Sequence, residues 1–133
     1  MIIIDAKKAV LGRLAATASK LALKGEEVII LNCEKVVVAG TKPNILAKYH
    51  RKRTMGDPLH GPYFPRQPNQ IVKRTIRGMV PYKQEKGLKA YNKIRCYKGI
   101  PDQFKDKKLE VIQETKLKNA TKYLTLEQIS ALI

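Results

Sequence analysis

Basic side chains interleaved with aromatic rings form the most chemically distinctive pattern in the sequence. Three short runs carry it: residues 48–53 (Lys-Tyr-His-Arg-Lys-Arg), 61–66 (Gly-Pro-Tyr-Phe-Pro-Arg) and 73–77 (Lys-Arg-Thr-Ile-Arg). The guanidinium group of an arginine can donate two parallel hydrogen bonds to the oxygens of one phosphate, and exposed aromatic rings stack on unpaired bases. This arrangement therefore predicts binding of a nucleic acid, RNA in particular.

Both residue types have an alternative interpretation. Tyr49, Tyr63 and Phe64 could pack in the core or against their own loop, and any single basic run could be a solvated face. The basic cluster as a whole is harder to explain in that way. Residues 41–99 hold 15 Lys and Arg against only Asp57 and Glu85. Folding these like charges together is unfavourable without a polyanion nearby, and RNA supplies one.

The charge distribution divides the chain into three parts. Residues 1–40 carry 6 basic and 4 acidic side chains, and residues 100–133 carry 6 and 5, so residues 41–99 hold most of the formal charge of +16. The length of 133 residues suits one domain. We therefore expect a single domain in which residues 1–40 and 100–133 form the scaffold and residues 41–99 bind RNA.

The N-terminal pattern predicts the fold class. Ile2–Ile4 and Val28–Leu31 are short apolar runs typical of buried strands. Between them, apolar residues recur at helical spacing from Leu11, and Gly25 is a plausible helix terminator. A strand, helix, strand unit implies a right-handed crossover and parallel pairing, and hence an α/β fold.

The middle of the chain predicts a helix followed by a long loop. Residues 36–38 indicate another short extended segment, after which Thr41 and Pro43 are typical of a helix start. We expect this helix to end near Tyr49. Between residues 51 and 68, six Gly and Pro residues predict a long, basic, Pro-rich loop.

Three further helices are predicted after the loop. The first ends at Pro81, and Lys73, Arg74 and Arg77 lie mostly off its apolar face. The buried positions expected in this helix are Ile71, Val72, Ile76, Met79 and Val80. Those expected in the next helix, which leads to a strand over residues 94–97, are Leu88 and Tyr91, with Lys83, Lys86, Lys89 and Lys93 outside. The last helix starts with a capping box at Thr125 and should bury Leu126, Ile129, Leu132 and Ile133.

The sequence contains no convincing motif for catalysis or for binding a cofactor. The first strand-to-helix turn contains only Gly12, too few glycines for a dinucleotide site. Two cysteines and two histidines (Cys33, His50, His60 and Cys96) lack the short spacing of a zinc site. We expect reduced, buried cysteines, exposed or phosphate-facing histidines, and no metal, cofactor, small-molecule substrate or enzyme activity. The start of the chain does not resemble a signal peptide, and no window resembles a membrane span.

Two rival functions fit part of the pattern. A free nucleotide-processing α/β enzyme is consistent with the strand, helix, strand start, but a fold is weak grounds for a function. A DNA-compacting protein fits the charge, although the Pro-rich middle offers no recognisable groove-reading helix. Saturable binding of a free nucleotide, or a preference for duplex DNA over structured RNA, would favour one of these.

Several motifs across nearly the whole chain resemble the ribosomal protein L13 family of the large ribosomal subunit. They are Asp5-Ala6, Leu11-Gly12-Arg13-Leu14-Ala15, Leu31-Asn32-Cys33-Glu34-Lys35, Lys48-Tyr49, Tyr63-Phe64-Pro65-Arg66 and Arg74-Thr75-Ile76-Arg77-Gly78-Met79-Val80-Pro81. The last motif and the Leu-Gly-Arg-Leu-Ala run are the most specific. The two ends of the chain resemble archaeal members, without the bacterial leader or the eukaryotic extension.

The resemblance implies a three-layer α/β/α fold around a small, largely parallel, four-stranded sheet. It also implies a structural role in the large ribosomal subunit of the cytoplasm, in contact with its ribosomal RNA and with neighbouring ribosomal proteins. Early subunit assembly and translation would be the processes served, with no catalytic role.

Composition and resemblance together select the candidate RNA-binding residues. The resemblance carries over Arg13, Lys48, Tyr49, Arg66, Arg74 and Arg77. Residues 54–60 vary within the family, so their contacts are not carried over and rest on composition alone. The full set is Arg13, Lys42, Lys48, Tyr49, His50, Arg51, Lys52, Arg53, Tyr63, Arg66, Lys73, Arg74, Arg77, Lys83, Lys86, Lys89, Lys93 and Arg95.

Overall fold

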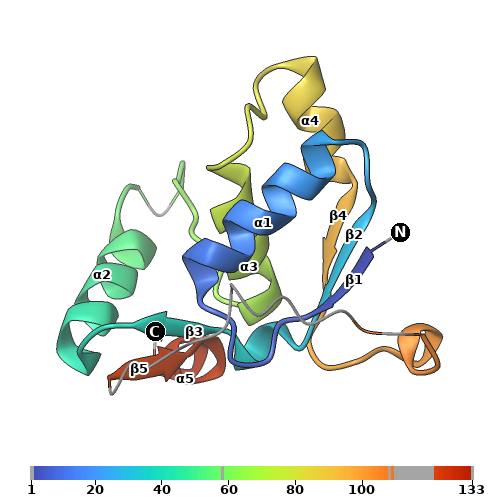
Figure 1. The fold of residues 1–133 in the computed structure, drawn as a ribbon. Helices are drawn as coiled ribbons and strands as arrows, with labels where there is room; N and C mark the ends of the chain where they lie inside the picture. Colours follow the sequence, from blue (N-terminus) through green and yellow to red (C-terminus); the bar gives the residue numbers. More distant parts are fainter. Residues whose placement is uncertain (1, 58, 108, 110–121, 133) are drawn as a thin grey trace.

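The structure is a computed structural model that describes residues 2–57, 59–107, 109 and 122–132 (Figure 1). A three-stranded parallel sheet lies at its centre, in the order β1 (Ile2–Asp5), β2 (Val28–Leu31), β4 (Ile94–Cys96). The helices are α1 (Leu11–Leu23), α2 (Lys42–Thr54), α3 (Pro68–Arg77), α4 (Glu85–Asn92) and α5 (Leu126–Leu132). The α/β class and the parallel pairing of the first two strands are confirmed.

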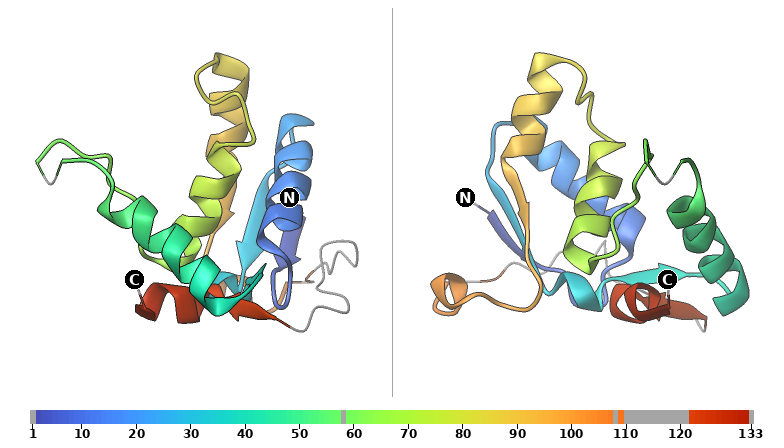
Figure 2. Two further views of the ribbon diagram at one scale, coloured as in Figure 1. Left: turned by 90° about the vertical axis from the view of Figure 1, so that its left-hand side faces the viewer. Right: turned by 180° about the vertical axis from the view of Figure 1, so that it is seen from behind.

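The strand register sorts the side chains of the sheet onto two faces. Ile4, Ile30 and Cys96 are aligned across the three strands and lie on one face. They belong to the same buried cluster as the apolar residues of α1 and α3, and these two helices lie side by side against the sheet (Figures 1 and 2). The main core therefore lies between the sheet and the layer of α1, α3 and α4.

The opposite face of the sheet has a smaller apolar cluster. Ile3, Ile29 and Leu31 pack there against Phe104, which lies in the 3-10 turn η2 (Asp102–Phe104). In the described ranges, this turn rather than a helix covers that face. Burial on both faces explains why the strands are continuous apolar runs.

A second sheet corrects the prediction of four strands. The segment predicted over residues 36–38 is β3 (Val37–Ala39), but it pairs antiparallel with β5 (Tyr123–Thr125), away from the parallel sheet. The cause lies at Asn32, which has a left-handed backbone (φ 59°) and enters the 3-10 turn η1 (Cys33–Lys35). Its side-chain nitrogen donates to Asp5 Oδ1 at 2.9 Å, which holds the turn against β1.

Helix α2 is longer than predicted, and the connection that follows is correspondingly shorter. The helix continues past Tyr49 to Thr54, and the backbone N–H of Met55 still donates to the Arg51 carbonyl. The reason is that Gly and Pro begin only at Gly56, so residues 50–54 contain no helix breaker. The described part of the chain between the two helices has a turn closed by backbone bonds between Asp57 and Gly61.

Some predicted core positions are exposed. Met79, Leu88 and Leu132 are 44%, 48% and 54% exposed, whereas the buried residues of α4 are Gly87 and Ala90. Met79 is exposed because α3 ends before it, at Arg77. Leu88 is exposed because α4 packs closely on its neighbours through small side chains. Lys83 precedes α4, and Ile133 lies outside the described residues.

Other local predictions are confirmed. The capping box at Thr125 is present: its N–H donates to Gln128 Oε1 at 3.1 Å, and the Gln128 N–H donates to its Oγ1 at 3.3 Å. Cys33 and Cys96 are free and buried. A hydrogen bond with Cys96, together with burial, raises the pKa of the Cys33 thiol, so it is unreactive as a nucleophile.

The close packing around Gly87 yields a stability prediction. An added methyl group at this residue would meet the backbone carbonyl of Pro81, whereas one at Gly12 on α1 would meet open space. Gly87→Ala should therefore lower the melting temperature by about 5 °C or more, the usual effect of overpacking. Gly12→Ala should leave it unchanged or slightly higher. Equal melting temperatures for both variants in a thermal scan would contradict this packing.

Candidate nucleic-acid interface

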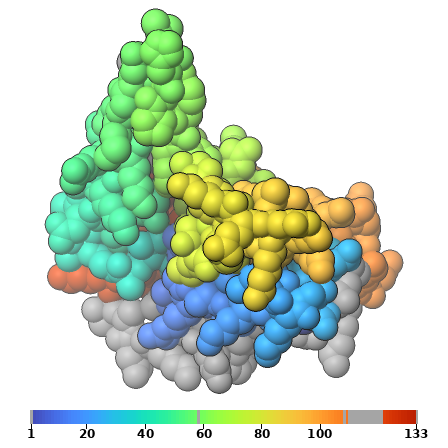
Figure 3. All heavy atoms as spheres, turned by 90° about the horizontal axis from the view of Figure 1, so that it is seen from above, coloured from blue at the N-terminus to red at the C-terminus, as the bar shows by residue number. Residues whose placement is uncertain are grey.

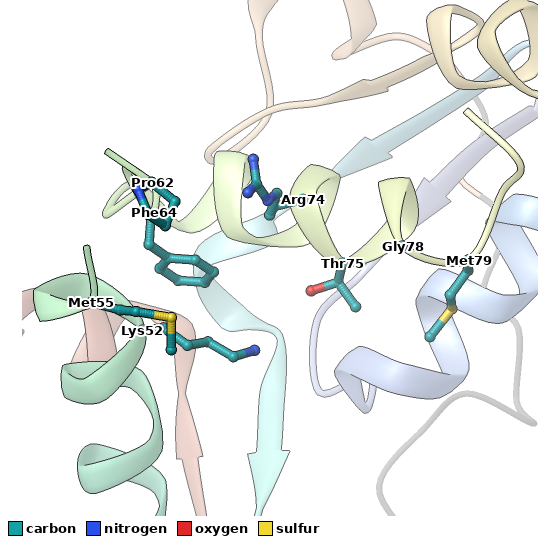
Figure 4. A pocket seen from close by; sticks show the side chains of 8 residues that line it. All are labelled: Lys52, Met55, Pro62, Phe64, Arg74, Thr75, Gly78 and Met79. Carbon is teal, nitrogen blue, oxygen red and sulfur yellow. The ribbon is translucent and has the colours of Figure 1, made fainter. Parts of the chain in front are cut away.

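A groove between α2 and α3 brings several predicted residues together. Its two walls come from the last turns of α2 and from α3 with the residues flanking it, as the close view shows (Figure 4). The lining residues are Lys52, Met55, Pro62, Phe64, Arg74, Thr75, Gly78 and Met79. Two of these, Lys52 and Arg74, belong to the predicted RNA-binding set, and they stand on opposite walls. We refer to this feature as the α2–α3 groove.

An aromatic pair lies beneath Lys52 at one side of the groove. The rings of Tyr49 and Phe64 have centroids 6.0 Å apart and are tilted by 52°. The Lys52 ammonium lies 5.4 Å from each ring centroid, within the range of a cation–π contact. Tyr49 itself is anchored in the core, one helical turn after the buried Ile45. The pair therefore fixes the position of Phe64 and of the lysine above it.

The groove is electropositive because its cations are close together and poorly neutralised. The pKa of Lys52 is lowered by burial first, and then by the nearby charges of Lys48 and Arg74. Ion pairs at Lys89 and Lys105 lie elsewhere, and among the described residues neither Lys52 nor Arg74 forms one. A phosphate would therefore enter a field that no ion pair among the described residues compensates at Lys52 or Arg74.

The cationic surface continues from the groove toward α4. A second hollow shares Phe64 and Arg74 with the groove and is also lined by Lys73 and Tyr91. The Lys73 ammonium lies 4.8 Å from the Tyr91 ring centroid. Similarly, the Arg77 guanidinium lies 4.8 Å from the ring centroid of Tyr82. These aromatic contacts orient the cations without neutralising them.

Three predicted lysines form a separate cationic surface near the end of α1. Lys86, Lys89 and Lys93 line a hollow between α4 and residues 22–25. The Lys93 ammonium donates to the Gly25 carbonyl at 3.4 Å, and Lys89 pairs with Glu85 at 3.1 Å. Seen from above, α4 (yellow) lies against α1 (blue), whereas α2 and the residues that follow it (teal to green) project on another side (Figure 3).

The remaining predicted residues are dispersed. Arg13 is exposed on α1, and Arg95 is exposed on the sheet face opposite α1 and α3, as its register with Ile29 shows. Lys42 and Arg53 are exposed on α2, and Lys83 is exposed between α3 and α4. His50 and Arg51 line a different side of α2 together with Leu132. The Arg66 carbonyl accepts a 2.7 Å hydrogen bond from the Ser130 hydroxyl, which ties this loop to α5.

The structure decides between the alternatives for the aromatic residues. Tyr49 is only 4% exposed, so its predicted role as an RNA-stacking ring is replaced by a supporting role in the core. Tyr63 is 65% exposed. Phe64 is half-buried, packing on the core while lining the groove.

Sequence reasoning missed the apolar lining of the groove, namely Met55 and Met79, and also Thr75. Met55 could have been predicted if the helix had been extended past Tyr49, because Lys48, Lys52 and Met55 recur at helical spacing on one face. Met79 was assigned to the core instead. Its exposure follows from the end of α3 at Arg77, which the sequence pattern did not indicate.

Across residues 2–57, 59–107, 109 and 122–132, no group of three or more His, Cys, Asp or Glu side chains could hold a metal ion. No helix in these ranges is both long and apolar enough to cross a membrane.

Comparisons with known proteins give a consistent result. The family model described as Ribosomal protein L13 matches residues 1–103. A protein of Methanosarcina barkeri is 41% identical over 133 residues, covering 98% of this chain and 95% of its own length. Proteins of Methanocaldococcus jannaschii and Archaeoglobus fulgidus are 43% and 38% identical, covering 98% and 96% of this chain and 95% and 84% of their own lengths. All three bear the name large ribosomal subunit protein uL13.

The crowding of cations in the groove gives a prediction about Lys52. Replacing Lys48 by Gln removes one of the two charges that lower the pKa of Lys52, so this pKa should rise. The rise should be partial, because burial is the larger cause. An NMR titration of the Lys52 side chain would measure it, with Lys42→Gln at the start of the same helix as a control. A Lys52 pKa that is identical in both variants would contradict the described proximity of the cations.

Proposed function

The chain belongs to the ribosomal protein L13 family, and from this premise we propose that it is a structural, RNA-binding constituent of the large ribosomal subunit. The assignment to the large ribosomal subunit comes from the names of the relatives. The observation that carries RNA binding is the α2–α3 groove, where neither Lys52 nor Arg74 forms an ion pair with an acidic side chain of the described residues. Large-subunit ribosomal RNA is the polyanion that would neutralise it.

The binding mode follows from the kind and the spacing of the cations. Arg74 and Arg77 lie one turn apart on α3, half-exposed, so both guanidinium groups can reach phosphates of one RNA strand. Contacts of this kind position a protein on folded RNA without reading its sequence. Specificity then comes from the shape of the RNA.

Two cationic surfaces on different parts of the molecule favour a role in assembly. The α2–α3 groove and the hollow at the lysines of α4 share no lining residue, and in the view from above α2 and α4 lie on different sides of the molecule (Figure 3). A protein with two such surfaces can contact two RNA segments at once and stabilise their relative position. We propose that the chain supports early subunit assembly and translation in this way, beside neighbouring ribosomal proteins and without catalysis.

The proposal predicts a steep dependence of RNA binding on salt. If about 6 to 10 phosphates are neutralised, affinity for large-subunit ribosomal RNA should fall by roughly 10³ to 10⁵ between about 50 and 200 mM salt. Replacing both Arg74 and Arg77 by Ala should weaken binding at low salt. It should also reduce the slope of log affinity against log salt concentration by about one to two.

A matched control loses the same charge elsewhere. The double variant Lys35→Ala, Lys122→Ala alters exposed residues that lie outside the predicted set and line neither cationic surface, so it should bind RNA nearly as the parent chain does. Melting temperatures should stay close to the parent value in both double variants, because none of the four side chains is buried. A flat salt response, or equal losses in the two double variants, would refute the assignment.

A further inference from the structure

The α2–α3 groove has an apolar half that phosphate binding leaves unused. Met55 and Met79 stand on its opposite walls and are 50% and 44% exposed, while Pro62 and Phe64 come from the loop between the helices. Phosphate contacts need only the cations. Exposed methionines are adaptable apolar surfaces that proteins use at binding sites. The lining therefore suits a ligand that is flat and apolar in one part and anionic in another.

The positions of the cations indicate how such a ligand would lie. Lys52 extends across the groove with its ammonium near the Phe64 ring, and Arg74 lies on the facing helix (Figure 4). The anionic part of the ligand would thus be held between Lys52 and Arg74. The apolar part would lie beside it, between the methionines.

A polar group is also available for the edge of the ligand. The Thr75 hydroxyl lines the groove and donates a 2.9 Å hydrogen bond to the Ile71 carbonyl. With its hydrogen used in this way, its oxygen remains an acceptor for an N–H group. The next residue along this wall of the groove, Gly78, has no side chain to obstruct approach.

We propose that the α2–α3 groove binds one unpaired RNA nucleotide, with the base between Met55, Phe64 and Met79 and its phosphate at Lys52 and Arg74. This inference rests on the proposed RNA-binding function and adds a ligand of defined chemistry to it. The hollow has a volume of about 480 Å³, which accommodates a nucleobase. A paired base hides both of its faces in the stack, so only a bulged or looped nucleotide can enter.

Three RNA hairpins test the proposal on the full-length chain. One has a single-nucleotide bulge, the second has an abasic residue at the bulged position, and the third is fully paired. The first two have the same number of phosphates, so their difference isolates the base. Because stacking of one base is worth about 1 to 3 kcal/mol, the bulged hairpin should bind about 5- to 100-fold more tightly than the abasic one.

Variants locate this preference in the groove. The double variant Met55→Ala, Met79→Ala should lose the preference for the bulged base while keeping its affinity for the abasic hairpin, because the cations are intact. The matched control is Leu88→Ala, Ile100→Ala, which removes exposed apolar side chains elsewhere (48% and 38% exposed) and should keep the preference.

Each other outcome has a definite meaning. Equal binding of the bulged and abasic hairpins would overturn the nucleotide site and leave the proposed RNA-binding function intact. A preference that survives in the methionine variant would overturn the groove as its location. If none of the hairpins bound, and ribosomal RNA did not bind either, the proposed function itself would fail together with the site.

Discussion

Apolar side chains of α2 and α3 hold two cationic helix faces close together against their mutual repulsion. Ile45 and Tyr49 of α2 share one buried cluster with Ile71, Val72 and Ile76 of α3. On the outer side of the same helices, Lys48, Lys52 and Arg74 lie close enough to lower the pKa of Lys52. The groove exists because burial of the inner faces outweighs this repulsion. An RNA phosphate would relieve the repulsion without rearranging the core.

This constraint explains why the basic segment cannot be separated from the scaffold. Residues 41–99 supply α3 and β4, which contact α1 and β2 at the centre of the molecule. The apolar stripe of α3 faces the core, while Arg74 and Arg77 remain half-exposed on its other side. One helix therefore stabilises the fold and presents cations to a partner. The backbone from which these cations project is therefore anchored by the core beneath it.

Much of the fold could be predicted from local patterns, and the errors have physical causes. The apolar runs of β1 and β2 and the spacing in α1 specify a parallel unit, which the structure confirms. The separate pairing of β3 with β5 depends on the left-handed turn at Asn32, a tertiary feature that periodicity does not reveal. For the site, clustering of basic residues indicated the groove cations. The burial of Tyr49 and the exposure of Met79 depend on where α2 and α3 end, and local sequence specifies helix ends poorly.

The most direct test of the central claim is sedimentation of the native protein from cell extract on a sucrose gradient, followed by a high-salt wash of the ribosomal fractions. The account predicts that the protein migrates with the large ribosomal subunit, resists moderate salt and is released only at high salt, since many phosphate contacts must be broken together. A protein that stayed at the top of the gradient would contradict the account. It would show that family membership and a cationic groove do not place this chain in the ribosome.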